Sequence, residues 1–308
     1  MLKEAWCVAT REIKRFYRQR IPLTTSLVTP LIWLALFGYA LSGGLPGFNL
    51  SSFGIQGIPT MLTFIVFSIN LDPLIGIVPV WVLWILKYYF VNLTTISYIS
   101  FLAPGIVSMS VMFTAMFAGV SIVWDRRFGF LNKLLVSPIP RTSIMLGKMI
   151  SATIRAVIQG LIVIALAILV GAKINTGPIG ILMAVPYMAL FALGFSGMST
   201  AVGIKMAEHE EFFGVINLVL MPLFFASGAL FPVALMPGWL QSVAYGNPLT
   251  YAVDAIRNAL LGGTFGLLQG GYAFIGIGGS LLVDVAVLGL FIVIMVSIGV
   301  TVFRRTLK

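Results

Sequence analysis

The chain has 308 residues, of which 59% are apolar and only 9% are charged, and its mean hydropathy is +1.07. Soluble domains carry roughly a quarter charged residues, so these charges are too few to cover a water-facing surface, and we expect most of the exterior to face lipid. The net charge of +10 does not indicate nucleic-acid binding, because the basic residues lie at the ends of apolar stretches rather than on a polar domain. One cysteine excludes an intramolecular disulfide framework, and one histidine argues against a metal site.

Residues 1–20 predict an amphipathic helix, with apolar side chains at helical spacing on one face and most charges on the other. Its acidic residues distinguish it from a signal peptide. We interpret it as a helix in the membrane interface, with Trp6 and Phe16 toward lipid and the arginines, such as Arg15, toward water. The alternative is a solvated helical cap.

Residues 21–308 are interpreted as a single transmembrane domain of an all-α polytopic membrane protein with six transmembrane helices. A helix of about 20 residues crosses roughly 30 Å of hydrocarbon. The predicted spans are residues 23–42, 99–124, 150–171, 178–204, 212–230 and 280–303.

The distribution of basic residues predicts the orientation. Sixteen of the nineteen Lys and Arg residues lie in or beside 1–20, 125–155, 205 and 304–308, and only Lys87, Lys173 and Arg257 fall on the other side. By the positive-inside rule, both termini are cytoplasmic and the number of crossings is even.

Two segments on the outer side are apolar but interrupted. In 58–90, Asn70, Asp72 and two prolines separate arms too short to span, which favours a re-entrant or interfacial hairpin. One long helix over 61–86 is the alternative. Prolines and Asn247 divide 231–278 into short pieces, which predicts outer re-entrant helices.

Ionisable residues inside predicted spans are few. Arg155 lies about two turns inside the third span, and we expect its side chain to extend to the cytoplasmic headgroups.

Three stretches resemble the ABC-2 type transporter permeases, in particular the daunorubicin and multidrug-resistance branch. They are the outer run from Ser227-Gly228-Ala229-Leu230-Phe231-Pro232 through Asn247-Pro248-Leu249-Thr250-Tyr251 to Arg257, the run Phe101-Leu102-Ala103-Pro104-Gly105, and the inner loop from Asp125-Arg126-Arg127-Phe128-Gly129 to Gly147-Lys148. The apolar insert at 58–90 departs from the family pattern.

This resemblance implies a homodimer of permeases in the plasma membrane, docked on separate cytoplasmic ATP-binding-cassette ATPase subunits. The residues agree, because the chain has no Gly-x-x-x-x-Gly-Lys-[Ser/Thr] phosphate loop. We therefore expect no catalytic residue, metal or cofactor of its own, with ATP and magnesium bound by the partner.

The inner loop 125–148 is the predicted ATPase-coupling element, because its short amphipathic helical turn, Phe128 to Val136, can seat in a groove of a soluble partner. A loop that only sets topology is the alternative. The candidate coupling residues are Arg126, Arg127, Phe128, Gly129, Leu131, Leu134, Pro138 and Arg141.

A second group of candidates lies in the outer signature region. Asp254 and Arg257 are three residues apart, so on a helix they share a face and could pair. We expect the pair to help hold an outer gate or re-entrant helix whose start is set by Asn247-Pro248, a structural role. The group is Asn247, Pro248, Tyr251, Asp254 and Arg257.

The predicted function is export of drugs, lipids or other amphipathic molecules by alternating access. An exporter of lipid-linked polysaccharide is the alternative within the class. An ion-coupled secondary transporter is less favoured, because mid-helix carboxylates and inverted repeats are not evident. A membrane-embedded enzyme is disfavoured by the lack of acidic metal-binding clusters and of a His-Glu-x-x-His motif.

Overall fold

The computed structural model describes residues 2–18, 28–36, 98–136, 139–230, 233, 236–261 and 281–306, and all regular structure in these ranges is helical. This confirms the all-α prediction for the described part. The insert 58–90, residues 262–278, most of the predicted span 23–42, and Pro138 lie outside the described residues.

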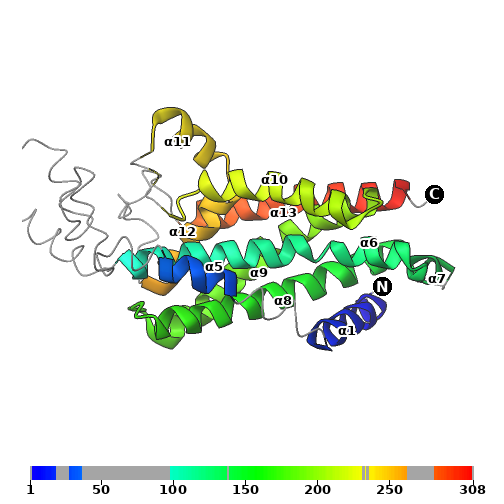
Figure 1. The fold of residues 1–308 in the computed structure, drawn as a ribbon, viewed down its shortest axis with the longest axis horizontal. Coiled ribbons are helices and arrows are strands. Elements are labelled where there is room, and N and C mark those ends of the chain that lie inside the picture. The colour runs from blue at the N-terminus through cyan, green and yellow to red at the C-terminus, as the bar shows by residue number, and fades with distance from the viewer. Residues whose placement is uncertain are drawn as a thin grey trace, which may run out of the picture.

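Long helices form a bundle whose axes follow the long direction of Figure 1. Four helical stretches in the described residues are long and apolar enough to cross a membrane, at Ile99–Arg127, Arg141–Leu169, Gly177–Lys205 and Leu282–Phe303. They correspond to α5 (Tyr98–Phe117) with α6 (Val120–Arg127), then α8 (Arg141–Leu169), α9 (Gly177–Lys205) and α13 (Leu281–Thr306). Helix α9 is central, since it packs against α5, α8, α12 and α13. Four of the six predicted spans are thus present as helices.

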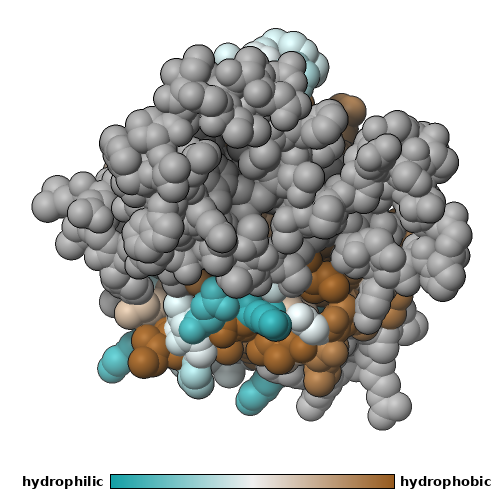
Figure 2. Space-filling model, turned by 90° about the vertical axis from the view of Figure 1, so that its left-hand side faces the viewer, coloured by the Kyte–Doolittle hydropathy of each residue, from teal (hydrophilic) through white to brown (hydrophobic). Residues whose placement is uncertain are grey.

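The two ends of the bundle differ in charge. Arg127, Arg141 and Lys205 lie where α6 ends, α8 begins and α9 ends, at the end that also carries the chain's C-terminus. We call this the basic end. Lys173 and Arg257 lie at the opposite end, where α5 begins and where the short helices α11 (Gly238–Tyr245) and α12 (Pro248–Leu261) lie. Seen from that end, the visible described residues are apolar with several hydrophilic residues among them (Figure 2).

Two predicted spans differ in their bounds. Helix α8 begins at Arg141 rather than at residue 150, because Pro140 precedes it and no proline interrupts the sequence from Arg141 to Leu169. The expected span 212–230 is α10 (His209–Phe225), which is 17 residues long. It ends early because Ser227 Oγ donates to the Phe224 carbonyl, 2.7 Å away, and the chain turns there.

Small residues bring α9 against the junction of α5 and α6. Ser199 accepts a hydrogen bond from the Gly119 amide at 2.8 Å and donates one to the Met116 carbonyl. It thus supplies partners for two backbone groups at the break between α5 and α6. A Cβ on Gly203 would lie 2.7 Å from the Gly119 carbonyl oxygen. The glycine is therefore required by a close helix–helix approach.

Candidate functional site

A helical hairpin projects at the basic end of the bundle. Helix α6 ends at Arg127, α7 (Phe130–Val136) follows, and α8 starts at Arg141. Gly129 between the first two helices has a φ of 68°, a left-handed conformation that suits glycine and lets the chain reverse within two residues. We call α6 and α7 the coupling hairpin. The sequence predicted its helical turn but placed it slightly early, at residues 128–136.

The coupling hairpin has a buried side and an exposed side. Leu131 is 1% exposed and packs with Ile144 and Phe303, and Leu134 packs against the same cluster. Phe128 is 66% exposed and Val136 is 87% exposed. Substitutions at Leu131 therefore test the packing of the hairpin, whereas Phe128 and Val136 are available to a partner.

An aromatic cluster continues the exposed side toward α10. Trp124 stacks on Phe128 with centroids 5.4 Å apart, and His209, the first residue of α10, meets the Trp124 ring edge-on at 4.3 Å.

The other candidate coupling residues include three arginines. Arg126 donates to the Ile204 carbonyl at 3.1 Å, and both Arg127 and Arg141 are exposed. Arg126 thus fixes the hairpin to α9.

Helix α1 (Leu2–Arg18) packs against the first turns of α8. Its buried face consists of Ala5, Val8, Ala9 and Glu12, at i, i+3, i+4 and i+7. The helices approach closely, since a Cβ on Gly147 would lie 2.5 Å from the Ala5 carbonyl oxygen.

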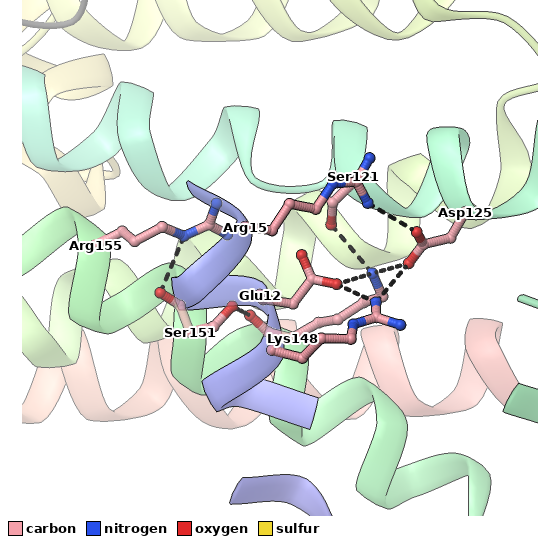
Figure 3. A network of polar contacts seen from close by, with 8 residues as sticks. Glu12, Arg15, Ser121, Asp125, Lys148, Ser151 and Arg155 are labelled. Atoms are coloured by element: carbon pink, nitrogen blue, oxygen red, sulfur yellow. Dashed lines mark hydrogen bonds and ion pairs between the residues drawn. The ribbon is translucent and has the colours of Figure 1, made fainter. Parts of the chain in front are cut away.

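A buried ion network joins α1, α6 and α8 (Figure 3). The Lys148 ammonium lies 2.6 Å from the Asp125 carboxylate and 3.3 Å from that of Glu12. The side chains of Lys148, Asp125 and Glu12 are 4%, 3% and 2% exposed. Arg11 and Arg15 lie 3.3 and 3.1 Å from Asp125. We call these five residues the ion network.

The network changes the expected orientation of α1. Arg11 and Arg15 bind Asp125 within the molecule because the carboxylate attracts them, although their side chains remain 35% and 40% exposed. Arg11 also lies over the Phe130 ring at 4.0 Å. Trp6 is 58% exposed on the other side of α1. The Arg155 guanidinium lies 5.1 Å from the centroid of Phe16.

Sequence reasoning missed Glu12, Asp125 and Lys148 as candidates. The available signal was the position of Glu12, seven residues after Ala5, which places an acid on the buried face of α1. Asp125 and Lys148 belong to the inner-loop stretch that resembles the permease family, but nothing in their spacing predicts that they pair.

The ionisation of Glu12 makes the docking of α1 sensitive to acid. Burial by itself would raise the pKa of Glu12, but the Lys148 ammonium and Arg11 guanidinium lower it from 4.5 to about 2. A lowered pKa in the folded state stabilises the protein above about pH 4.5, and this contribution is lost as the pH falls toward 2. We expect the melting-temperature difference between wild type and Glu12→Gln to shrink over that interval. The exposed Glu208→Gln is the control, and a constant difference would contradict the assignment.

The outer signature residues form a second cluster at the opposite end. Asn247 accepts a hydrogen bond from the Leu249 amide at 2.9 Å, which caps α12, and its side-chain amide donates to the Leu223 carbonyl at 2.6 Å. Pro248 is the first residue of α12, where a missing amide hydrogen costs nothing. Tyr251 donates to the Tyr245 carbonyl at 2.8 Å. The sequence correctly placed the start of this helix.

Arg257 connects three elements in this cluster. Its Nη2 donates to the carbonyls of Gly228 at 2.9 Å and Phe101 at 3.4 Å, and the guanidinium lies 3.9 Å from the Phe101 ring centroid. Asp254 is also buried and lies within electrostatic reach of Arg257. The arginine therefore holds α12 to the start of α5 and to the turn after α10.

The described residues contain no group of three or more His, Cys, Asp or Glu that could hold a metal ion. What they offer is a projecting hairpin with an exposed apolar side, fixed to an amphipathic helix by buried charges. Such an arrangement can pass on a displacement from the hairpin to the helices that it contacts.

Comparison with known proteins gives a consistent result. The profile of the family described as ABC-2 type transporter matches residues 3–261. A transport permease ycf38 from Cyanophora paradoxa is 24% identical over 100% of this chain and 90% of its own length. The ycf38 permease of Porphyra purpurea is 35% identical over 54% of this chain and 58% of its own length. The daunorubicin resistance ABC transporter permease DrrB1 of Streptomyces coeruleorubidus is 27% identical over 56% and 61%. The matched stretches thus span less than two thirds of these last two relatives.

Proposed function

The chain belongs to the ABC-2 type transporter family, and on that basis we propose that it is the permease subunit of an ATP-driven exporter whose coupling hairpin docks on a separate ATP-binding-cassette ATPase. The observation that carries the proposal is the exposed apolar side of the hairpin, where Phe128 stacks on Trp124 and Val136 is also exposed. Exposed aromatic anchors of this kind are typical of interface hot spots. In this proposal the basic end is cytoplasmic, in agreement with the positive-inside rule.

The ion network gives the hairpin a means of moving other elements. Asp125 in α6 is bound to α1 through Arg11 and Arg15 and to α8 through Lys148. A force applied by the ATPase at Phe128 would therefore reach α1 and α8 together. We propose that this drives alternating access between two permease subunits in the plasma membrane, with both chain termini cytoplasmic and α1 at the inner membrane surface.

The proposed cargo is an amphipathic molecule such as a drug or lipid. Support comes from the similarity to DrrB1, which is named for daunorubicin resistance. Further support comes from the apolar character of the long helices, which suits a hydrophobic cargo. Magnesium and ATP would be bound by the partner.

The docking proposal predicts that charge on the exposed side of the hairpin prevents ATPase binding. Phe128→Asp and Val136→Asp should each lower the affinity for the cognate ATPase by about 30-fold, since loss of an interface hot spot costs about 2 kcal/mol. Both side chains are largely exposed, so the permease should still fold. Co-purification and calorimetric titration measure the affinity, and cargo-stimulated ATP hydrolysis measures coupling.

Trp239→Asp is the matched control, because Trp239 is 71% exposed on α11 at the opposite end. It should bind the ATPase as the wild type does. Equal affinity of wild type and both hairpin variants would refute the docking surface. Failure of any ATP-binding-cassette ATPase to associate with the wild-type chain would refute the exporter.

A further inference from the structure

We propose that the seam between α1 and α8 binds the phosphate of an anionic lipid headgroup through the guanidinium of Arg155. This site is independent of the transport function and requires only that the chain lies in a membrane.

The first argument is the surplus of positive charge at the seam. Arg155 has electrostatic interactions with both Glu12 and Arg15 of the ion network. Together with Arg155, the network holds four cations and two carboxylates in the part of the chain that the structure describes. Both carboxylates are already shared among Lys148, Arg11 and Arg15. The cluster therefore has two positive charges in excess, which an external anion would balance.

The second argument is the set of donors that Arg155 leaves available. Its Nε donates to the Ser151 carbonyl at 3.2 Å, and the guanidinium plane is held near the Phe16 ring. Within the described ranges, the terminal nitrogens Nη1 and Nη2 have no hydrogen-bond partner, and the side chain is partly exposed. Figure 3 shows Arg155 at the edge of the group, on the side away from Asp125. A planar pair of donors of this kind matches two oxygens of a phosphate.

The third argument is the position of Arg155 along α8. Before it, α8 carries the charged or polar residues Arg141, Lys148 and Ser151; from Ala156 to Leu169 the only polar side chain is the buried Gln159. Partly exposed apolar side chains follow directly, among them Val157, Ile158 and Leu161. At this boundary the apolar residues that follow Arg155 would contact the acyl chains. The guanidinium would then lie at the level of the lipid headgroups. This favours a lipid phosphate over a soluble anion.

The test uses the purified full-length chain in neutral detergent, without any ATPase. Phosphatidylglycerol, phosphatidylcholine and inorganic phosphate are titrated separately, and binding is followed by thermal unfolding and by native mass spectrometry of retained lipid. We expect phosphatidylglycerol to bind and to raise the melting temperature. Phosphatidylcholine and millimolar inorganic phosphate should have little effect.

Arg155→Gln should weaken phosphatidylglycerol binding by about fivefold or more, since a basic residue at a membrane surface contributes about 1 kcal/mol. Lys205→Gln, at an exposed basic residue where α9 ends, is the matched control and should bind normally. If Arg155→Gln folds poorly, Arg155→Lys keeps the charge without the planar donors and should bind with intermediate affinity. Equal phosphatidylglycerol affinity in the wild type and a folded Arg155 variant would overturn the proposal. So would an effect of inorganic phosphate as large as that of the lipid, because the ligand would then be a free anion.

Discussion

Replacing Asp125 by asparagine is expected to release α1 from the bundle and to cost about 3–5 kcal/mol of folding stability, because it removes one partner of a buried ion pair. Asp125 is 3% exposed and is the shared acceptor for Lys148, Arg11 and Arg15. Without its charge, these cations would retain only the carboxylate of Glu12. The change is isosteric, so the effect would come from charge rather than from a cavity.

The natural Cys7 provides the readout for this prediction. It is the only cysteine in the chain, and it is exposed on α1. A spin label at Cys7 and another at an introduced Lys205→Cys report the distance between α1 and the end of α9. We expect this distance to broaden in Asp125→Asn, together with a lower melting temperature.

Two further variants test whether the lost charge of Asp125 causes the loss of stability and the broadened distance. Glu210→Gln removes an exposed acid at the same end of the bundle and should change neither measurement. Adding Lys148→Met to Asp125→Asn removes the buried cation that lost its partner, so the double variant should be more stable than the sum of the two single effects predicts. Additive losses would show that the network does not act as a unit.

Arg257→Met should produce the second large effect, at the opposite end of the bundle. It removes the hydrogen bonds to the carbonyls of Gly228 and Phe101, and it removes the positive charge of Arg257 that acts on the buried Asp254. We expect a loss of about 3 kcal/mol or more, with α12 separating from the start of α5. Thermal unfolding measures the loss of stability, and hydrogen exchange of the amides of residues 249–261 measures the separation of α12.

Arg257→Lys distinguishes charge from shape at this position. Lysine keeps the positive charge but lacks the planar guanidinium that lies over Phe101, so it should recover less than half of the lost stability. Lys173→Met, an exposed cation at the same end, is the control and should be neutral. Full recovery by lysine would mean that only the charge of residue 257 matters.

Sequence reasoning succeeded where one local signal decided the outcome. The apolar stretches around residues 99–124 and 178–204 are long enough to span a membrane, and both are helices in the structure. Asn247 and Pro248 begin a helix because one residue caps it and the other suits its first turn. For α10 the length was overestimated, since apolar residues continue past Phe225 while the helix does not.

The sequence by itself determined that this protein is helical, that it lies in a membrane and that its basic residues gather at one end, because composition and hydrophobic length leave few alternatives. Only the tertiary structure decided what the charged residues do. Glu12, Asp125 and Lys148 are far apart in the chain, and no periodic pattern shows that three helices bring them together in a buried network. In the same way, Leu131 and Phe128 look equally suited to docking until packing buries one and exposes the other. Helical spacing is a local property, whereas the partner that a side chain meets depends on how the helices pack.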